Sequence, residues 1–188
     1  KKNLKFADTL KLIRDNGSKA MLTGELADNI FTTVSEHKNS PGLMIKKDFS
    51  FVKPVLTAPI CGKYRKWKIC GMGPPSSGGI TVLQILGILN NFKLSSDNPN
   101  DPEVWHLFLE AAKLAYTDRG YYIADNDFID VPIELMLDEK YLKERSKLIK
   151  NNSIISNPQK GKFNNDSTKY LGIDSTSEKP STTHLSII

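Results

Sequence analysis

The spacing of apolar residues predicts helices in the first part of the chain. Apolar positions recur at helical intervals over residues 3–15, and Gly17 interrupts the pattern. The same periodicity resumes over residues 18–37, where Ser18 is the expected N-cap. A cluster of turn-forming residues follows, and residues 45–48 then predict a short helical step. The pattern therefore places two amphipathic helices before any strand.

Strand-forming residues then predict a β-hairpin over about residues 54–72. Its turn is expected at or near Arg65-Lys66, because strand character resumes after this pair. In that register Cys61 and Cys70 lie directly opposite one another, close enough to consider a disulfide. Two free, small hydrophobic side chains are the alternative, and the residues alone leave both interpretations open.

The second half of the chain predicts a buried helix and further helical segments. The glycine-rich stretch 71–79 leads into a helix over residues 80–92 with apolar residues on nearly every face, so this helix should be deeply buried. Asp101 and Pro102 are the expected N-cap and first residue of a long helix that ends near Arg119. Two more helices are expected over residues 132–137 and 139–149.

Polar residues dominate residues 151–181, where no apolar periodicity is present, so we expect a flexible surface segment. Residues 182–188 then alternate apolar and polar side chains, which predicts the beginning of a strand. A strand that stops at the last residue has no neighbour to pair with. The sequence therefore indicates a fragment of a longer chain.

Composition is that of a folded protein and excludes several functional classes. Of the 188 residues, 39% are hydrophobic and 25% are charged, a balance typical of globular rather than disordered chains. No apolar run approaches the roughly 20 residues that a membrane-spanning helix needs. The net charge is +5, but the lysines are mostly scattered, so we expect no nucleic-acid partner.

Three patterns suggest chemistry, and each has a simpler structural explanation. The stretch 71–79 lacks the third glycine of a dinucleotide fingerprint and the lysine of a phosphate loop, which favours a tight turn capped by its serines. The three histidines are too far apart in sequence for metal ligands, so no metal or cofactor is expected and His106 should be structural. Adjacent Asp118 and Arg119 predict a buried ion pair rather than an acid–base pair, because arginine keeps its proton.

Thr182 occupies the position that an N-terminal nucleophile needs, after a polar segment and at the head of a strand. A threonine hydroxyl is a weak nucleophile and needs an adjacent base. Cleavage before Thr182 would free an α-amino group, with a pKa of about 7.7–8.0, that can accept the hydroxyl proton. The same hydroxyl could first attack the carbonyl of Ser181, so that the precursor cleaves itself. An ordinary loop threonine is the alternative interpretation.

Four motifs occur along the chain in a set order, and the resemblance that they carry covers nearly the whole chain. They are Thr57-Ala58-Pro59-Ile60 with Gly62-Lys63-Tyr64-Arg65, then Pro74-Pro75-Ser76-Ser77-Gly78-Gly79-Ile80, then Ala115-Tyr116-Thr117-Asp118-Arg119, and finally Thr182-Thr183-His184. In this order they resemble the γ-glutamyltransferase family, or glutathione hydrolases, which are N-terminal-nucleophile hydrolases. The resemblance implies that Thr182 is the catalytic nucleophile and that the Ser181–Thr182 bond is cleaved autocatalytically.

The resemblance also implies the reaction and its partners. A zymogen would be processed into a large and a small subunit, and a γ-glutamyl group would be held as a threonine ester. Water or an acceptor amino acid or peptide would then receive the group from glutathione or a related γ-glutamyl compound, without a cofactor. The fold implied for the intact enzyme is an αββα sandwich, to which this chain contributes an α+β, predominantly helical part with one hairpin.

The same resemblance assigns the parts of the chain. Residues 1–150 would be a helical large-subunit region, 151–181 the pre-cleavage segment and 182–188 the first strand of the small subunit. It implies a periplasmic or secreted location, which favours a Cys61–Cys70 disulfide. The family's substrate-clamp and oxyanion residues fall outside the chain, so this fragment alone is expected to be inactive. The alternatives are an acylase or poly-γ-glutamate depolymerase of the same fold, and a non-enzymatic homologue that is never processed.

Overall fold

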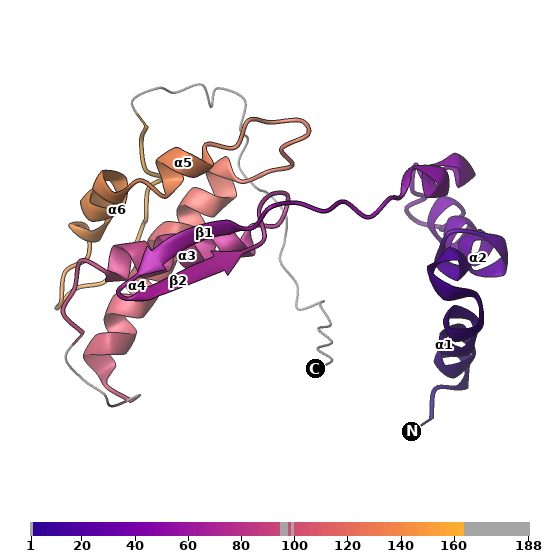
Figure 1. Cartoon of the computed structure of the whole chain (residues 1–188), viewed down its shortest axis with the longest axis horizontal. Helices are drawn as coiled ribbons and strands as arrows, with labels where there is room; N and C mark the ends of the chain where they lie inside the picture. The colour runs from indigo at the N-terminus through magenta and orange to yellow at the C-terminus, as the bar shows by residue number, and fades with distance from the viewer. Residues whose placement is uncertain (1, 95–97, 99, 164–188) are drawn as a thin grey trace. The chain divides into compact units, whose positions relative to one another are not determined.

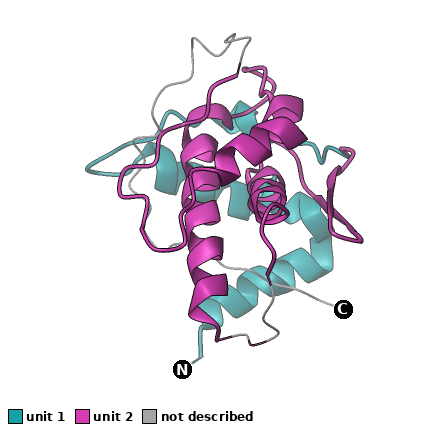
Figure 2. Ribbon diagram, turned by 90° about the vertical axis from the view of Figure 1, so that its left-hand side faces the viewer, with its two compact units in different colours: residues 1–56 teal, residues 57–188 magenta. Residues whose placement is uncertain are grey.

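A computed structural model of the chain describes residues 2–94, 98 and 100–163. The chain divides into two compact units, with the boundary between Leu56 and Thr57 (Figure 2). Residues 52–59, at this boundary, form neither helix nor strand. The boundary falls within residues 1–150, for which the resemblance implies a helical large-subunit region.

The first unit contains two α-helices and two short 3₁₀-helices. They are α1 (Leu4–Asn16), η1 (Gly17–Met21), α2 (Gly24–Ser35) and η2 (Lys46–Phe51) (Figure 1). The predicted helices are confirmed, but the expected N-cap at Ser18 is wrong, because Ser18 lies inside η1. Gly17, with a φ of +66°, ends α1, and the 3₁₀-helix η1 then separates α1 from α2. Among the described residues of this unit, only Ala27 is buried.

The second unit is built around α3 (Gly78–Leu89), which packs against α4 (Pro102–Tyr122) (Figure 1). The prediction of a deeply buried helix is confirmed, because seven of the twelve residues of α3 are buried. Burying a leucine or isoleucine side chain contributes roughly 1.5–3 kcal/mol, so this helix is the main apolar support of the unit. The buried residues of the larger cluster are Ile85, Ile88, Leu89, Leu107, Ala111, Leu114, Ala115, Leu142 and Ile149.

Helix α4 begins as predicted and ends later than predicted. The Asp101 side chain accepts a hydrogen bond from the Glu103 backbone N–H at 2.9 Å, and Pro102 is the first helical residue. The helix continues past Arg119 because Tyr122 is buried against Phe163, with ring centroids 4.8 Å apart. The two further helices are confirmed with shorter bounds, as α5 (Ile133–Met136) and α6 (Glu139–Ser146).

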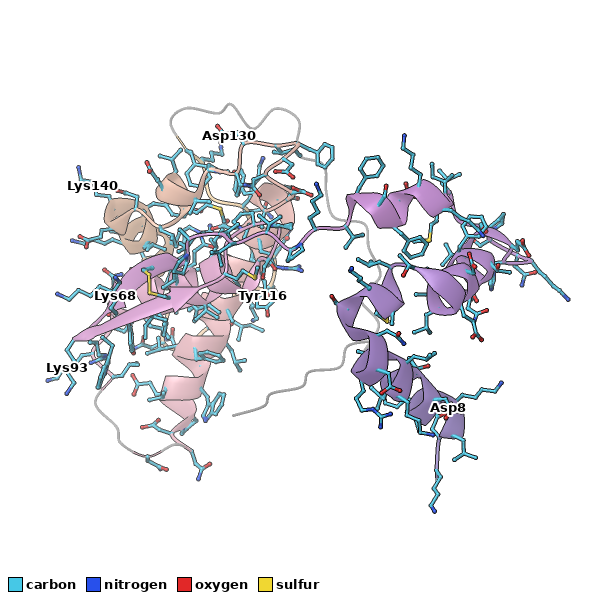
Figure 3. The ribbon with its side chains drawn as sticks, turned by 45° about the vertical axis from the view of Figure 1, so that its right-hand side comes forward. Asp8, Lys68, Lys93, Tyr116, Asp130 and Lys140 are labelled. Atoms are coloured by element: carbon cyan, nitrogen blue, oxygen red, sulfur yellow. A yellow bond between two sulfur atoms is a disulfide. The ribbon has the colours of Figure 1, made fainter. Side chains whose placement is uncertain are left out.

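The predicted hairpin is confirmed, although its paired strands are shorter than the expected range 54–72. Strands β1 (Ile60–Tyr64) and β2 (Trp67–Gly71) pair antiparallel, and Cys61 lies opposite Cys70 in the predicted register. A disulfide joins these two cysteines, which decides between the two interpretations (Figure 3). At the turn, Arg65 has a φ of +52°, and its backbone N–H donates to Asn90 Oδ1 at the end of α3.

Two glycines allow the hairpin to approach the start of α3 closely. A Cβ atom at Gly71 would lie 2.6 Å from the Cα of Gly79, and a Cβ atom at Gly79 would overlap the carbonyl oxygen of Met72. The prediction of a tight strand-to-helix turn is therefore confirmed. The expected serine cap is not formed by Ser77, which stands at the N-cap position without a side-chain capping bond. Its Oγ accepts a hydrogen bond from Arg119 Nε at 2.9 Å instead.

The structure describes residues 151–163 of the polar segment 151–181. Residues 151–163 pack against α4 and α6, and Phe163 at their end is buried. Residues 164–181 and the strand predicted for 182–188 lie outside the described residues. Within the described part, the fold class is confirmed as predominantly helical α+β with one two-stranded hairpin, and no helix there is long and apolar enough to cross a membrane.

The disulfide gives a first prediction, because it closes a short loop in the unfolded chain. We expect Cys61 and Cys70 to resist iodoacetamide unless a reductant is present, as read by intact-mass spectrometry. Reduction should lower the free energy of unfolding by about 2–3 kcal/mol in urea. The Cys61→Ser/Cys70→Ser variant should match the reduced wild type, whereas alkylation without reductant would contradict the pairing.

The glycine contact gives a second prediction with a matched control in the neighbouring residue. Gly79→Ala should lower the free energy of unfolding by about 1–3 kcal/mol, because the new methyl group meets the backbone at Met72. A Cβ atom at Gly78 would meet nothing within 4 Å, so Gly78→Ala should be neutral or stabilising by up to about 1 kcal/mol. Equal effects of the two substitutions in urea unfolding would show that close packing is not the reason why position 79 needs a glycine.

Candidate functional site

The two residues predicted to carry the chemistry lie beyond the described part of the chain. Ser181 and Thr182 fall within residues 164–188, so the cleavage bond and the nucleophile stay predictions. The structure does describe the point from which the chain runs toward them. This point lies where residues 150–163 pack against helix α4. We call residues 150–163 the docked segment.

Three polar side chains of α4 hold backbone groups of the docked segment. The pairs are His106 Nε2 with Lys150 O at 2.8 Å, Glu110 Oε2 with Ile155 N at 2.6 Å, and Asp118 Oδ1 with Gly161 N at 2.8 Å. The structural role predicted for His106 is confirmed by the first of these contacts. Backbone groups that leave water need partners, and Glu110 and Asp118 supply them for Ile155 and Gly161, whereas the His106 contact is exposed.

Glu110 is a buried carboxylate, 1% exposed, with a partner on each oxygen. Its Oε1 accepts from Lys113 Nζ at 2.6 Å, and its Oε2 accepts from the backbone N–H of Ile155. Burial raises the pKa of a carboxyl group, but these two donors outweigh that effect and hold the pKa of Glu110 below its ordinary value. Glu110 therefore binds the docked segment in its ionised form.

Asp118 is the centre of a second and larger buried cluster, and its side chain has no exposed surface. One oxygen accepts from Arg145 Nη2 at 3.0 Å and from the Gly161 N–H, while the other accepts from Tyr141 O–H at 2.5 Å and from Gln84 Nε2 at 3.4 Å. Burial raises the pKa of Asp118, and Arg145 and the hydrogen-bond donors act against this. Burial also raises the pKa of Tyr141, and the Asp118 carboxylate, to which its hydroxyl donates, raises that pKa further.

The ion pair predicted for Asp118 exists, but its partner was predicted wrongly. Asp118 pairs with Arg145 of α6 and not with the adjacent Arg119. Successive residues of an α-helix point about 100° apart, so neighbours in sequence face different surroundings. Arg119 points toward the start of α3, where it donates to Ser77 Oγ and lies over the ring of Tyr116, labelled in Figure 3.

The end of the docked segment is held from two further sides. Tyr122 O–H donates to the carbonyl oxygen of Gly161 at 2.5 Å, so both backbone polar groups of that residue are bonded. The ring of Phe163 packs on the rings of Tyr122 and Tyr141, with centroids 4.8 Å away in each case. Residues 161–163 are thus fixed by polar and apolar contacts together.

Sequence reasoning missed Glu110, Arg145 and Gly161. Glu110 and Arg145 each stand among apolar residues of a helical pattern, which is the available signal for a buried charge. Gly161 had no such signal, because its partners come from residues 118 and 122, far away in sequence. In the described residues, no group of three or more histidine, cysteine, aspartate or glutamate side chains is placed to hold a metal ion.

The contacts of Glu110 predict a pH dependence. Since its pKa is lowered by folding, its contribution to stability is present above the ordinary glutamate pKa of about 4.3 and is lost as the pH falls through the lower, folded-state pKa. Glu110→Gln should therefore lower the free energy of unfolding by about 1–3 kcal/mol at pH 7 and by progressively less below about pH 4. Urea titrations at several pH values measure this difference.

Glu144→Gln is the matched control for Glu110, because its carboxylate pairs with Lys147 in solvent. It should change the free energy of unfolding by less than about 1 kcal/mol at every pH. An effect of Glu110→Gln that stays constant down to pH 3 would show that the charge of Glu110 does not hold the docked segment.

Comparison with known proteins identifies the family of this chain. The family model described as Gamma-glutamyltranspeptidase matches residues 1–188. A glutathione hydrolase proenzyme of Bacillus subtilis is 34% identical over 187 residues, which is 97% of this chain and 31% of the relative. An acylase ACY 1 proenzyme of Pseudomonas sp. strain V22 is 34% identical over 144 residues, which is 77% of this chain and 25% of the relative.

A solved structure shows the same fold. The γ-glutamyltranspeptidase of Helicobacter pylori superposes with a TM-score of 0.69 at 26% identity, covering 95% of this chain and 48% of that one. The chain spans about a third or less of the length of the curated relatives described above. Because the family model matches along the whole sequence, the chain belongs to the gamma-glutamyltranspeptidase family.

Proposed function

We propose that the protein containing this chain hydrolyses and transfers γ-glutamyl groups, with glutathione and related compounds as donors. The observation that carries the proposal is the reach of the family match, which includes Ser181 and Thr182. The Bacillus subtilis relative aligned over 187 residues is named a proenzyme, which supports cleavage of a precursor. Thr182 is then the nucleophile, and the Ser181–Thr182 bond is the site of cleavage.

Maturation would follow from the chemistry of the threonine hydroxyl. Thr182 Oγ attacks the carbonyl carbon of Ser181, the peptide C–N bond breaks, and the acyl group passes from nitrogen to oxygen as an ester. The hydroxyl proton goes to the released amino group. Water then hydrolyses the ester, which leaves a carboxylate on Ser181 and a free α-amine on Thr182.

Turnover would use the new α-amine of Thr182 as the base. This amine accepts the proton of its own hydroxyl while Oγ attacks the γ-carbonyl carbon of the donor. The amide C–N bond breaks, the leaving amine takes the proton, and the glutamyl group remains as an ester on Oγ. Water gives glutamate, and the amino group of an acceptor amino acid or peptide gives a new γ-glutamyl amide.

The partners of the chain follow from the same proposal. After cleavage, residues 1–181 would belong to the large subunit, and the part of the precursor that begins at Thr182 would be the small subunit. The two subunits would stay associated. We place the protein in the periplasm or outside the cell, because disulfides such as Cys61–Cys70 persist in oxidising compartments. The match of the Gamma-glutamyltranspeptidase family model to residues 1–188 supports a γ-glutamyl donor.

The test compares full-length wild-type protein with its Thr182→Ala variant by intact-mass spectrometry and with a chromogenic γ-glutamyl anilide. Wild type should give two subunits that separate at Thr182, and the variant should stay whole and lose at least about a thousandfold in kcat/KM. Thr182→Ser keeps a hydroxyl and should retain slow cleavage. A wild-type protein that never cleaves would support a non-enzymatic homologue, and faster release from β-lactam side-chain amides would support an acylase.

A further inference from the structure

We infer that the turn end of the hairpin is a contact surface for membranes that contain anionic lipid. Its members are four cations and one tryptophan, and we call it the basic tip: Lys63, Arg65, Lys66, Trp67 and Lys68. The inference goes beyond the proposed γ-glutamyl reaction and does not depend on it, because it concerns attachment of the protein to a surface and involves no step of catalysis.

The charge of this part of the chain is one-sided. Residues 49–96 contain six lysines and arginines and no aspartate or glutamate, and four of the six cations stand in the basic tip. Within the described part of the chain, the ion pairs involve none of these four. Glu139 of α6 lines a hollow beside Lys63, but Lys143 lines the same hollow and offsets its charge. The basic tip therefore keeps its positive charge in the folded unit.

The hairpin holds these cations against two local costs. Lys63 and Lys68 are directly opposed in the strand pair, and like charges at such positions destabilise the pairing. Arg65 has a φ of +52°, a region that residues other than glycine seldom adopt. Conflicts of this kind between sequence and local structure are typical of functional sites, where stability is not the only requirement.

The basic tip is held in one conformation. The Cys61–Cys70 disulfide joins the two strands behind the cations (Figure 3). The side chain of Asn90, at the end of α3, accepts from the Arg65 N–H at 3.2 Å and donates to the Lys63 carbonyl oxygen at 3.1 Å. A surface that is already fixed loses little conformational freedom when it binds, so its charges act together.

Trp67 favours a membrane over other polyanions as the partner. Its side chain is 60% exposed, and Lys66 Nζ lies 5.0 Å from the centroid of its ring. Tryptophan is enriched at membrane–water interfaces, where its ring lies at the level of the headgroups while lysine and arginine are attracted to anionic lipid. The disulfide indicates an oxidising compartment, outside the cytosol, which favours a lipid surface over nucleic acid.

The expected attachment is reversible and depends on salt. One lysine or arginine near an anionic membrane strengthens binding about fivefold, so the four cations of the basic tip together give roughly 600-fold. Salt screens charges that are exposed to solvent, and all four of these side chains are exposed. We therefore expect binding at low ionic strength that weakens steeply as salt is added.

The experiment measures how the full-length protein sediments with vesicles. One set contains about 30% phosphatidylglycerol in phosphatidylcholine and the other phosphatidylcholine alone, each at about 0.05 M and about 0.5 M NaCl. The variants are Lys63→Gln/Lys68→Gln and Trp67→Gln. Lys5→Gln/Lys19→Gln is the matched control, because it removes the same charge from exposed lysines of the first unit. Urea unfolding checks the fold of each variant, and Lys63→Gln/Lys68→Gln should be at least as stable as wild type.

Wild type should bind the anionic vesicles at low salt and leave the neutral ones in the supernatant. Lys63→Gln/Lys68→Gln should bind about 20–30-fold more weakly, and Lys5→Gln/Lys19→Gln should bind like wild type. The loss caused by Trp67→Gln should persist as the salt concentration rises, because salt does not screen an apolar contact.

The inference is overturned if wild type does not bind anionic vesicles, if it binds neutral vesicles equally well, or if the Lys63→Gln/Lys68→Gln variant binds like wild type. Tighter binding to polyglutamate or to an oligonucleotide than to vesicles, lost in the same variant, would replace the membrane by a polyanion in solution. A protein that binds anionic vesicles but is never cleaved at Thr182 would overturn the proposed function and leave this inference standing.

Discussion

The buried carboxylate of Asp118 is the constraint on which the second unit depends. Its partners come from α3, α6 and the docked segment, while Asp118 itself belongs to α4. A charge without exposed surface is expensive to remove from water, and only a full set of donors makes it tolerable. The four donors can meet on two oxygens only when these elements lie in one arrangement. The cluster therefore specifies the packing of the unit more than it adds to the net stability.

Apolar packing supplies the driving force that this polar cluster directs. The two hydrophobic clusters lie at either end of α3, one around Ile88 and Leu114 and the other around Ile80 and Met136. Hydrophobic burial is non-directional, so it brings helices together without fixing which backbone groups meet. The buried pair of Asp118 and Arg145 adds that direction, and the glycine contact between the hairpin and α3 adds another.

Much of the fold could be predicted because it depends on local pattern. The periodicity of α1, the apolar character of nearly every face of α3, the cap at Asp101 and the register that opposes Cys61 to Cys70 all follow from neighbouring residues. The partner of Asp118 and the docking of residues 151–163 could not be predicted in this way. The sequence of residues 151–163 is polar and aperiodic, and the side chains that hold this segment come from α4, some 40 residues earlier.

By itself, the sequence determined the helical and hairpin elements, the family, and the threonine on which the proposed chemistry depends. Only the tertiary structure decided that the stretch before that threonine begins from a fixed point, and which carboxylates hold it there. The physical reason is that local patterns encode which face of an element is apolar, whereas a buried charge is satisfied by donors from several elements at once. Those donors come together only when the whole unit has folded.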